Sequence, residues 1–431
     1  MAEQSRRSYW LVALIALIFF VISFLTNILG PIIPDIIQSF GLSLTLASFL
    51  PFSFFVAYGL LSIPSGMAVE RWGEKPLLVF AFALALAGSL AFAVLQNYPA
   101  ALASLFVIGA GMAVLQVAIN PLLRTAGGEE HYAFNMVMMQ LVFGLASFLS
   151  PKLYTYLVTN LGAGAQQPNA FLDLLRRLTP VQMEWISVYW IFAAVSAAML
   201  ALALLLRLPR VELAESERIG AWETPRRLLR KRIVILYFIG IFCYVGTEQG
   251  IANWTSKFLA VYHGLDPQRE GAAAVSHFWG LMTVGTVVGL ALLKLFDSRR
   301  VLIGFSLAAL ACYTVALTGT AETASLALPL MGFFISSMWS IIFSLALNSV
   351  EKYHGAFSGI LCTAIAGGAV VPVIIGSLGD LFGLRAGLAF LYATLLYILG
   401  IGFWARPLVV NETIWRRRAA TRAGKTREGP A

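Results

Sequence analysis

The sequence predicts an all-α integral membrane protein, with twelve transmembrane helices in two pseudo-symmetric bundles of six. Three observations support this prediction: an apolar composition, long runs without charge, and one polar segment that divides the chain. Of the 431 residues, 59% are hydrophobic and only 12% are charged, whereas soluble domains carry about 25% charged residues. The composition therefore indicates that most side chains face lipid or a protein interior.

Ten long runs of the sequence contain no Asp, Glu, Lys or Arg, and each could cross about 30 Å of hydrocarbon as a helix of roughly 20 residues. The run from Pro76 to Leu123 has 48 residues, which as one helix would exceed twice the bilayer thickness at about 1.5 Å per residue. It must fold back, and Gln96-Asn97-Tyr98-Pro99 is the predicted turn because Asn and Pro interrupt helices. Since lipid offers no partner for free backbone groups, the spans are expected to be helices.

Two more spans carry isolated charges, Lys152 in one of them and Glu248 with Lys257 in the other. The segment 160–184 between the fifth and sixth spans is expected at the surface, with a short helix. The twelve expected spans cover approximately residues 9–35, 45–70, 76–95, 99–123, 133–159, 186–207, 232–262, 271–296, 299–319, 323–350, 355–382 and 384–406.

A polar segment rich in Arg and Glu separates the first six spans from the last six. The predicted organisation is an N-terminal bundle over 9–207, a cytoplasmic linker over 208–231, a C-terminal bundle over 232–406 and a basic cytoplasmic tail over 407–431. Two parallel halves of six helices are typical of duplicated transporters, in which the substrate site lies between the halves.

The basic residues predict the orientation of the chain. If both termini are cytoplasmic, 24 of the 30 Lys and Arg residues lie on the cytoplasmic side, which agrees with the positive-inside rule. The expected location is a cell membrane, plasma or inner. The formal net charge of +9 then reflects topology, so no nucleic-acid partner is expected.

The cysteines and glycines point to no metal or nucleotide cofactor. Cys243, Cys312 and Cys362 lie in expected spans without a CxxC pair, which is typical of small buried apolar residues. Glycines within spans are typical of packing and hinge positions, and neither a GxGxxG after a strand nor a Walker sequence occurs.

The segment after the second span resembles the loop motif of the major facilitator superfamily. It contains Gly66, then the acid–Arg pair Glu70 and Arg71, then Gly73 and Lys75. A tight Gly turn can hold charges at helix ends, where they bridge two helices in one conformation and release them in another. The resemblance implies the twelve-helix fold of that superfamily and a role for these five residues in conformational gating.

Three further motifs resemble the fucose, galactose and glucose symporter group. They are Leu115 to Pro121 in the fourth span, Tyr244 to Glu248 with Trp254 in the seventh, and Ala366 to Pro372 with Gly376 and Asp380 in the eleventh. The resemblance implies a sugar transporter that works by alternating access, with a cation usually coupled.

Three positions depart from this group. Gly30 stands in the first span where an acid is expected, Gln116 stands where fucose-type symporters place Glu, and Thr286 occupies a position that frequently holds Arg. Proton coupling of the fucose type is therefore not implied for this chain.

Glu248 is the acid placed deepest in an expected span. A charge at that depth costs roughly 2.5–3.5 kcal/mol on insertion scales, so the carboxyl should face a cavity, pair, or be protonated. As a functional group it would bind a proton or Na+ and couple that cation to transport. The alternative is a neutral structural Glu that bonds to a facing helix.

Side-chain amides form the rest of the predicted substrate site. Gln116 and Asn120 are four residues apart and share one helix face. An amide offers a donor and an acceptor together, which matches neighbouring sugar hydroxyls; the alternative is hydrogen bonding between helices. Further candidate amides at plausible depth are Asn27, Gln140, Asn253 and Asn348.

Aromatic rings are the second requirement of a sugar site, because the C–H faces of a pyranose pack on them. Trp254 and Trp279 are the candidates, with Trp339 as a further one. The alternative for each is packing or a place at the membrane interface.

The sequence therefore favours a secondary active transporter for a monosaccharide or related polyol, coupled to H+ or Na+ through Glu248 and without a cofactor. Alternatives are an uncoupled sugar uniporter, an exporter of a lipid or amphipathic drug, and a nutrient sensor without transport. An enzyme is not expected, because one acid in the middle of a span and four scattered His residues form no catalytic set. The expected partners are the sugar and membrane lipid, and the chain is expected to be a monomer.

Overall fold

The computed structural model describes residues 9–127, 132–162, 169–206, 223–350 and 353–408. The described chain is helical and contains no strand. Twelve of its helical stretches are long and apolar enough to cross a membrane. The predicted all-α class with twelve spans is therefore confirmed.

The N-terminal half carries the first six spans and a short surface helix. It consists of α1 (Tyr9–Thr26), α2 (Leu29–Phe40), α3 (Leu44–Trp72), α4 (Glu74–Val94), α5 (Tyr98–Gly127), α6 (Tyr132–Leu161), α7 (Ala170–Leu178), η2 (Glu184–Ile186) and α8 (Ser187–Leu205).

The C-terminal half carries the other six spans. It consists of α9 (Glu223–Leu228), α10 (Arg232–His263), η4 (Pro267–Gly271), α11 (Ala272–Leu295), α12 (Ser298–Thr318), α13 (Ala321–Ile335), α14 (Met338–Leu347), α15 (His354–Thr363), η5 (Ala364–Ala366), α16 (Gly367–Phe382), α17 (Leu384–Ala389) and α18 (Leu391–Trp404).

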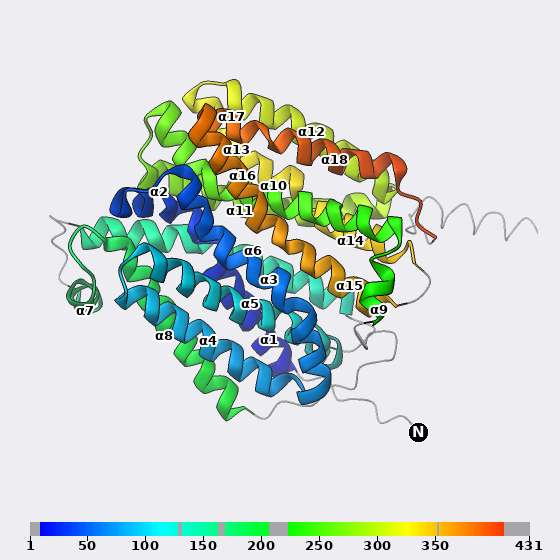
Figure 1. Cartoon of the computed structure of the whole chain (residues 1–431), viewed down its shortest axis with the longest axis horizontal. Helices are drawn as coiled ribbons and strands as arrows, with labels where there is room; N and C mark the ends of the chain where they lie inside the picture. The colour runs from blue at the N-terminus through cyan, green and yellow to red at the C-terminus, as the bar shows by residue number, and fades with distance from the viewer. Residues whose placement is uncertain (1–8, 128–131, 163–168, 207–222, 351–352, 409–431) are drawn as a thin grey trace, which may run out of the picture.

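The two halves lie side by side, with one face of the bundle carrying the start of α1 and the end of α18 (Figure 1). We call this face the terminal face. The opposite face, called the far face, carries α7 and the turn between α2 and α3. Buried apolar side chains form one cluster in each half, and few residues cross over, such as Ile33 and Ala47 in the cluster of the C-terminal half.

Close approach of backbones holds the helices of each half together, because lipid supplies no hydrophobic force between them. At Gly109 in α5, an added Cβ would collide with the carbonyl of Phe54 in α3. Gly367 in α16 meets the carbonyl of Phe242 in α10 in the same way. These glycines therefore act as packing positions, as the sequence indicates.

The first span is broken in its middle, between α1 and α2. Pro31 has no N–H, so it cannot bond the carbonyl of Asn27 four residues earlier, and its ring would clash there. The hydroxyl of Thr26 donates to the carbonyl of Ile22 at 2.6 Å just before the break. The helix therefore ends at Thr26 and starts again at Leu29.

The first span is also longer than the sequence predicts. The prediction ends it at residue 35, because Asp35 interrupts the charge-free run, but the helix continues to Phe40. Asp35 is buried and accepts hydrogen bonds from other helices, so its polar group is satisfied inside the span. The tenth span is broken as well, at Ser336 and Ser337 between α13 and α14.

Candidate functional site

A cavity of about 160 Å³ lies between the two halves. A water molecule occupies about 10–15 Å³ on the same measure, so there is room for a solute of about a dozen non-hydrogen atoms. The N-terminal half contributes side chains from α1, α3, α5 and α6, and the C-terminal half contributes from α10, α11, η5 and the break in the tenth span. The break in the first span, at Asn27, and the break in the tenth span, at Ser336, therefore both lie at the cavity.

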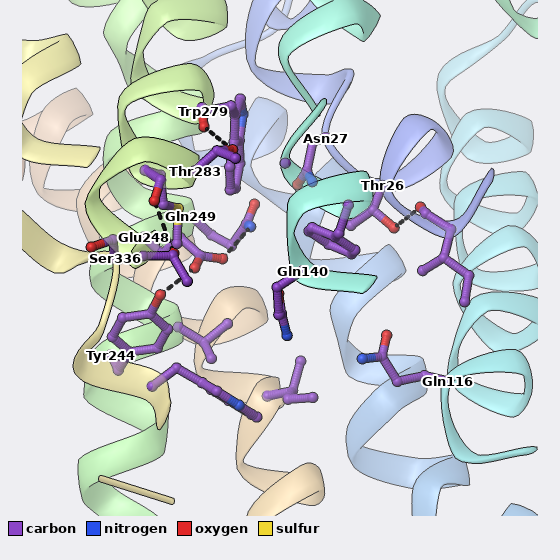
Figure 2. Close-up of a pocket in the computed structure, with 18 of the residues that line it drawn as sticks. Thr26, Asn27, Gln116, Gln140, Tyr244, Glu248, Gln249, Trp279, Thr283 and Ser336 are labelled. Carbon is purple, nitrogen blue, oxygen red and sulfur yellow. Dashed lines mark hydrogen bonds between the residues drawn. The ribbon is translucent and has the colours of Figure 1, made fainter. Parts of the chain in front are cut away.

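Glu248 projects into this cavity from α10 (Figure 2). The hydroxyl of Tyr244 donates to its Oε2 at 2.7 Å, and the amide of Gln249 donates to its Oε1 at 3.1 Å. Both donors are neutral and belong to the same helix as the carboxyl. The described residues that line the cavity include no Lys, Arg or His, so a cation or proton that neutralises Glu248 would have to enter from solution.

Asn27 reaches the cavity from the break in the first span. Its amide donates to the hydroxyl of Ser147 in α6 at 2.8 Å, and Ser147 shares a 2.6 Å hydrogen bond with Ser23. The amide nitrogen is thus fixed, whereas the buried Oδ1 of Asn27 has no partner. A buried acceptor without a donor is costly unless a ligand supplies one.

Trp279 forms part of the wall on the side of the C-terminal half. Its side chain is 3% exposed and its indole Nε1 has no hydrogen-bond partner. The neighbouring hydroxyls of Thr283 and Thr286 donate to carbonyls of their own helix at 2.9 Å. Trp339, from the broken tenth span, lines the cavity and lies 6.0 Å from the ring of Tyr244. The residues that line the cavity therefore include aromatic rings, and two of them carry a buried polar atom without a partner, Nε1 of Trp279 and Oδ1 of Asn27.

Five predicted site residues line the cavity together: Asn27, Gln116, Gln140, Glu248 and Trp279. In Figure 2, Gln116 lies on the side of the N-terminal half, Glu248 lies on the opposite side, and Gln140 lies between them. These five residues come from five different spans, which the fold brings to one space.

Three predicted site residues lie elsewhere. Asn253 and Trp254 are 2% and 0% exposed and do not line the cavity; they lie about 140° and 120° from Glu248 around the α10 axis, at about 100° per residue. Asn348 follows α14 at the terminal face, where its carbonyl accepts from the backbone N–H of Leu408 at 2.7 Å. The side chain of Asn120 lies outside the described part of the chain.

The proposed gating motif lies at the terminal face, far from the cavity. Gly73 has φ +82°, which allows the sharp turn between α3 and α4. The ammonium of Lys75 donates to the carbonyls of Leu204 and Leu206 at 3.0 and 2.7 Å, so it caps the end of α8. The guanidinium of Arg71 lies 5.8 Å from the ring centre of Trp72. A gating role for Gly66, Glu70, Arg71, Gly73 and Lys75 stays a prediction.

Gly30, where related sequences are expected to carry an acid, is in direct contact with the other half. A Cβ at this position would overlap the carbonyl oxygen of Ala252 in α10. The backbones of α2 and α10 touch there, so no side chain of any kind fits. In this conformation the glycine therefore permits close packing between the halves that an acid at this position would prevent.

Several cavity residues were not among the predicted ones. Tyr244 and Gln249 hold the carboxylate, and Ser336 and Thr283 add hydroxyls. Helical periodicity could have found Tyr244, which lies only about 40° from Glu248 on the same helix. Ser336 depends on the break in the tenth span, for which the sequence gives no proline signal.

Two named transporters are similar to this chain over most of its length. Residues 15–370 match the model of the family described as Major Facilitator Superfamily. A glucose/galactose transporter of Brucella abortus is 30% identical over 393 residues, 89% of this chain and 90% of that protein. The L-fucose-proton symporter of Escherichia coli K12 is 26% identical over 403 residues, 89% and 90% of the two chains.

Two solved structures share the fold. The crystal structure of the E. coli fucose:proton symporter aligns with a TM-score of 0.66 and 22% identity, covering 93% of this chain and 100% of that one. A bacterial homologue of the human lysosomal transporter Spinster, inward-facing and occupied, aligns with a TM-score of 0.76 and 15% identity, covering 94% and 97%. At sequence identities of 22% and 15%, these alignments show a shared fold.

The contact at Gly30 yields a stability prediction. Gly30→Ala should lower the melting temperature of the detergent-solubilised protein, because overpacking a tight contact costs about 1–3 kcal/mol. Gly304→Ala is the matched control, since an added Cβ there meets nothing within 4 Å. Equal melting temperatures for the two variants would show that α2 and α10 do not touch at Gly30.

Proposed function

This chain belongs to the major facilitator superfamily, and from this membership we propose that it carries a monosaccharide or related polyol across a membrane by alternating access. It is a multi-pass membrane protein with twelve spans. The predicted resemblance to the fucose, galactose and glucose symporter group is confirmed by its similarity to a glucose/galactose transporter and a fucose symporter. Those names describe the relatives, and they support a sugar as the cargo of this chain.

The observation that carries the proposal is the chemistry of the central cavity. The side chains of Gln116, Gln140, Asn27 and Trp279 all line one space of hexose-like size, and the buried Oδ1 of Asn27 and Nε1 of Trp279 have no protein partner. Such groups match a ring of hydroxyls, each of which donates and accepts. A lipid or an amphipathic drug would leave these groups without partners, which disfavours the exporter alternative.

The charge of the cavity narrows the proposed cargo to neutral sugars. Thr286 occupies the position where related sequences frequently carry Arg, and its hydroxyl is bonded within its own helix. A uronic acid or sugar phosphate would meet the carboxyl of Glu248 without a balancing cation from the described lining residues. We therefore expect hexoses and polyols to be preferred over their acidic derivatives.

Glu248 is the proposed coupling residue for H+ or Na+. It is the one carboxyl that lines the cavity among the described residues, and it is held by neutral donors only. A proton or Na+ bound to Glu248 would neutralise its carboxylate. The conformational change of the loaded protein would then cost less free energy than the same change with an unpaired buried charge. An uncoupled uniporter is the second candidate, favoured by the glycine at position 30.

We propose further that the terminal face is cytoplasmic, in a plasma or inner membrane. The excess of Lys and Arg in segments beside the spans on that face supports this orientation. No cofactor is needed for the proposed cycle, because the gradient of the coupling ion or of the sugar supplies the driving force.

Purified protein in liposomes tests the proposal. Uptake of labelled hexoses, polyols, a uronic acid and a sugar phosphate should be measured with a pH gradient, with a Na+ gradient and with neither. A neutral sugar that accumulates with one gradient supports a symporter, and uptake that only equilibrates supports a uniporter. Absence of uptake for every neutral sugar, with uptake of a lipid or drug, would refute the proposed cargo.

The coupling role of Glu248 has its own test. Glu248→Gln should abolish gradient-driven accumulation but preserve exchange of labelled for unlabelled sugar, because the amide cannot take up the ion yet can keep its hydrogen bonds. Glu322→Gln, at an exposed position in the first turn of α13, is the control for charge removal. Accumulation at the wild-type level in Glu248→Gln would exclude this carboxyl as the coupling group.

The free indole donor predicts a specific loss of affinity. Trp279→Phe keeps an aromatic ring but removes the N–H, and should raise the KM for sugar about two- to tenfold, which corresponds to one hydrogen bond. Trp254→Phe is the matched control, because its buried Nε1 also lacks a partner but lies away from the cavity. The same KM for both variants would mean that Trp279 does not contact the sugar.

A further inference from the structure

Asp35 connects the two halves near the far face. This carboxyl of α2 is 8% exposed and accepts a hydrogen bond of 2.5 Å from the hydroxyl of Tyr154 in α6. It also accepts from the amide of Gln268, in η4 of the other half, at 3.1 and 3.3 Å. The hydroxyl of Thr155 donates to the backbone carbonyl of Gln268 at 2.8 Å. Gln268 is therefore held by the N-terminal half through both its side chain and its backbone.

Asp380 makes a second connection at the same face, in the opposite direction. It lies near the end of α16 in the C-terminal half and accepts from the backbone N–H groups of Leu44 and Thr45, at 2.9 and 2.8 Å. These are free donors at the start of α3, where the helix dipole also favours a negative charge. The hydroxyl of Ser43 accepts from the N–H of Leu46, so Asp380 of the other half completes the cap of α3 at Leu44 and Thr45.

The backbone geometry at this point brings α16 unusually close to α3. Gly376 lies one turn before Asp380, and a Cβ on it would press against the carbonyl of Leu44 and the hydroxyl of Ser48. The glycine permits the approach that puts the Asp380 carboxyl within reach of the helix start. Asp380 itself is exposed, so water can replace its partners when the helices separate.

The position of these contacts relates them to the cavity. Asp35 follows Asn27 by eight residues in the same span, which places it roughly 12 Å nearer to the far face at about 1.5 Å per residue. The contacts therefore lie between the cavity and the solution on that side. Movement of the halves apart at the far face would separate α2 from η4 and α3 from α16.

We infer that Asp35 and Asp380 form a latch that closes the cavity toward the far face and must break for the cavity to open there. The far-face latch consists of Asp35 with Tyr154 and Gln268, and Asp380 with the start of α3. This inference rests on the proposed alternating access, and it assigns to two acids outside the cavity the task of positioning the halves. Because each half supplies one of the two acids, movement apart breaks the bonds between Asp35 and Gln268 and those between Asp380 and the start of α3 together.

The latch differs in its consequences from a static structural contact. A static contact only stabilises the fold, so its loss lowers the melting temperature and leaves the balance between conformations unchanged. A latch stabilises one conformation relative to another, so its loss shifts populations in the folded protein. Loss of one hydrogen bond to a carboxyl should change the ratio of the two conformations about fivefold or more.

Spin-label distance measurements on the full-length protein in lipid nanodiscs test the latch without any sugar. A far-face pair at Gln96 and Glu322 and a terminal-face pair at Leu205 and Arg300 each join opposite halves at exposed positions. The labels require a background in which the native cysteines are replaced by alanine, at positions Cys243, Cys312 and Cys362.

Asp380→Asn and Asp35→Asn should each add a longer distance for the far-face pair and a shorter one for the terminal-face pair. Gln268→Ala is a second variant, which removes the amide that reaches Asp35 from the other half, and it serves if the Asp35 variant fails to fold. Asp173→Asn is the matched control, since Asp173 bonds Arg176 of its own surface helix. Asp173→Asn should leave both distance distributions unchanged.

Distance distributions that stay at the wild-type form in Asp380→Asn and Gln268→Ala would overturn the latch, even if these variants melt at lower temperature. The measurement is independent of the cargo. A protein that shifts as expected but transports no sugar would refute the proposed function and leave the latch in place.

Discussion

The constraint on which this structure depends is the requirement that polar groups buried in a membrane protein find partners. Apolar spans meet it by forming helices, which satisfy their own backbones. Where a span breaks, as at Asn27, or carries an acid, as at Glu248 and Asp35, the polar groups face the boundary between the halves. That boundary is therefore where a polar solute can be bound and where polar contacts can hold the halves together.

The same requirement divides the boundary into two regions with different chemistry. Among the residues that line the central cavity, the acceptor of Asn27 and the donor of Trp279 have no protein partner, and we propose that a solute with hydroxyls supplies one. Toward the far face, the carboxyls of Asp35 and Asp380 have their donors from the opposite half or from a neighbouring helix. Binding and closure thus use the same kinds of group, satisfied by a ligand in one region and by protein in the other.

The sequence predicts the fold well because the apolar runs in the sequence and the helical spans in the structure both follow from burial in a membrane. The expected spans lie close to the observed ones, and the main difference, at Asp35, arises because a charge ends a hydropathy run although tertiary hydrogen bonds keep it in the helix. The depth of Glu248 also follows from the sequence alone. Its direction into the cavity does not, because an apolar helix surrounded by lipid and protein shows little contrast between its faces.

The site is therefore predicted only in part. Asn27, Gln116, Gln140 and Trp279, chosen by residue type and resemblance, line the cavity, whereas Asn253 and Trp254 lie on another side of α10. The partnership between Asp35 and Gln268 joins positions more than 200 residues apart, and no local pattern encodes it. The reason for a glycine at position 30 likewise appears only when α2 is placed against α10.

The central claim is that the cavity between the halves binds the sugar. An electron cryomicroscopy structure of the protein with a transported sugar tests it most directly. The account predicts a pyranose or polyol within hydrogen-bond distance of Asn27 Oδ1 and Trp279 Nε1, with Glu248 beside it. A sugar bound elsewhere while this cavity holds only water or lipid would contradict it.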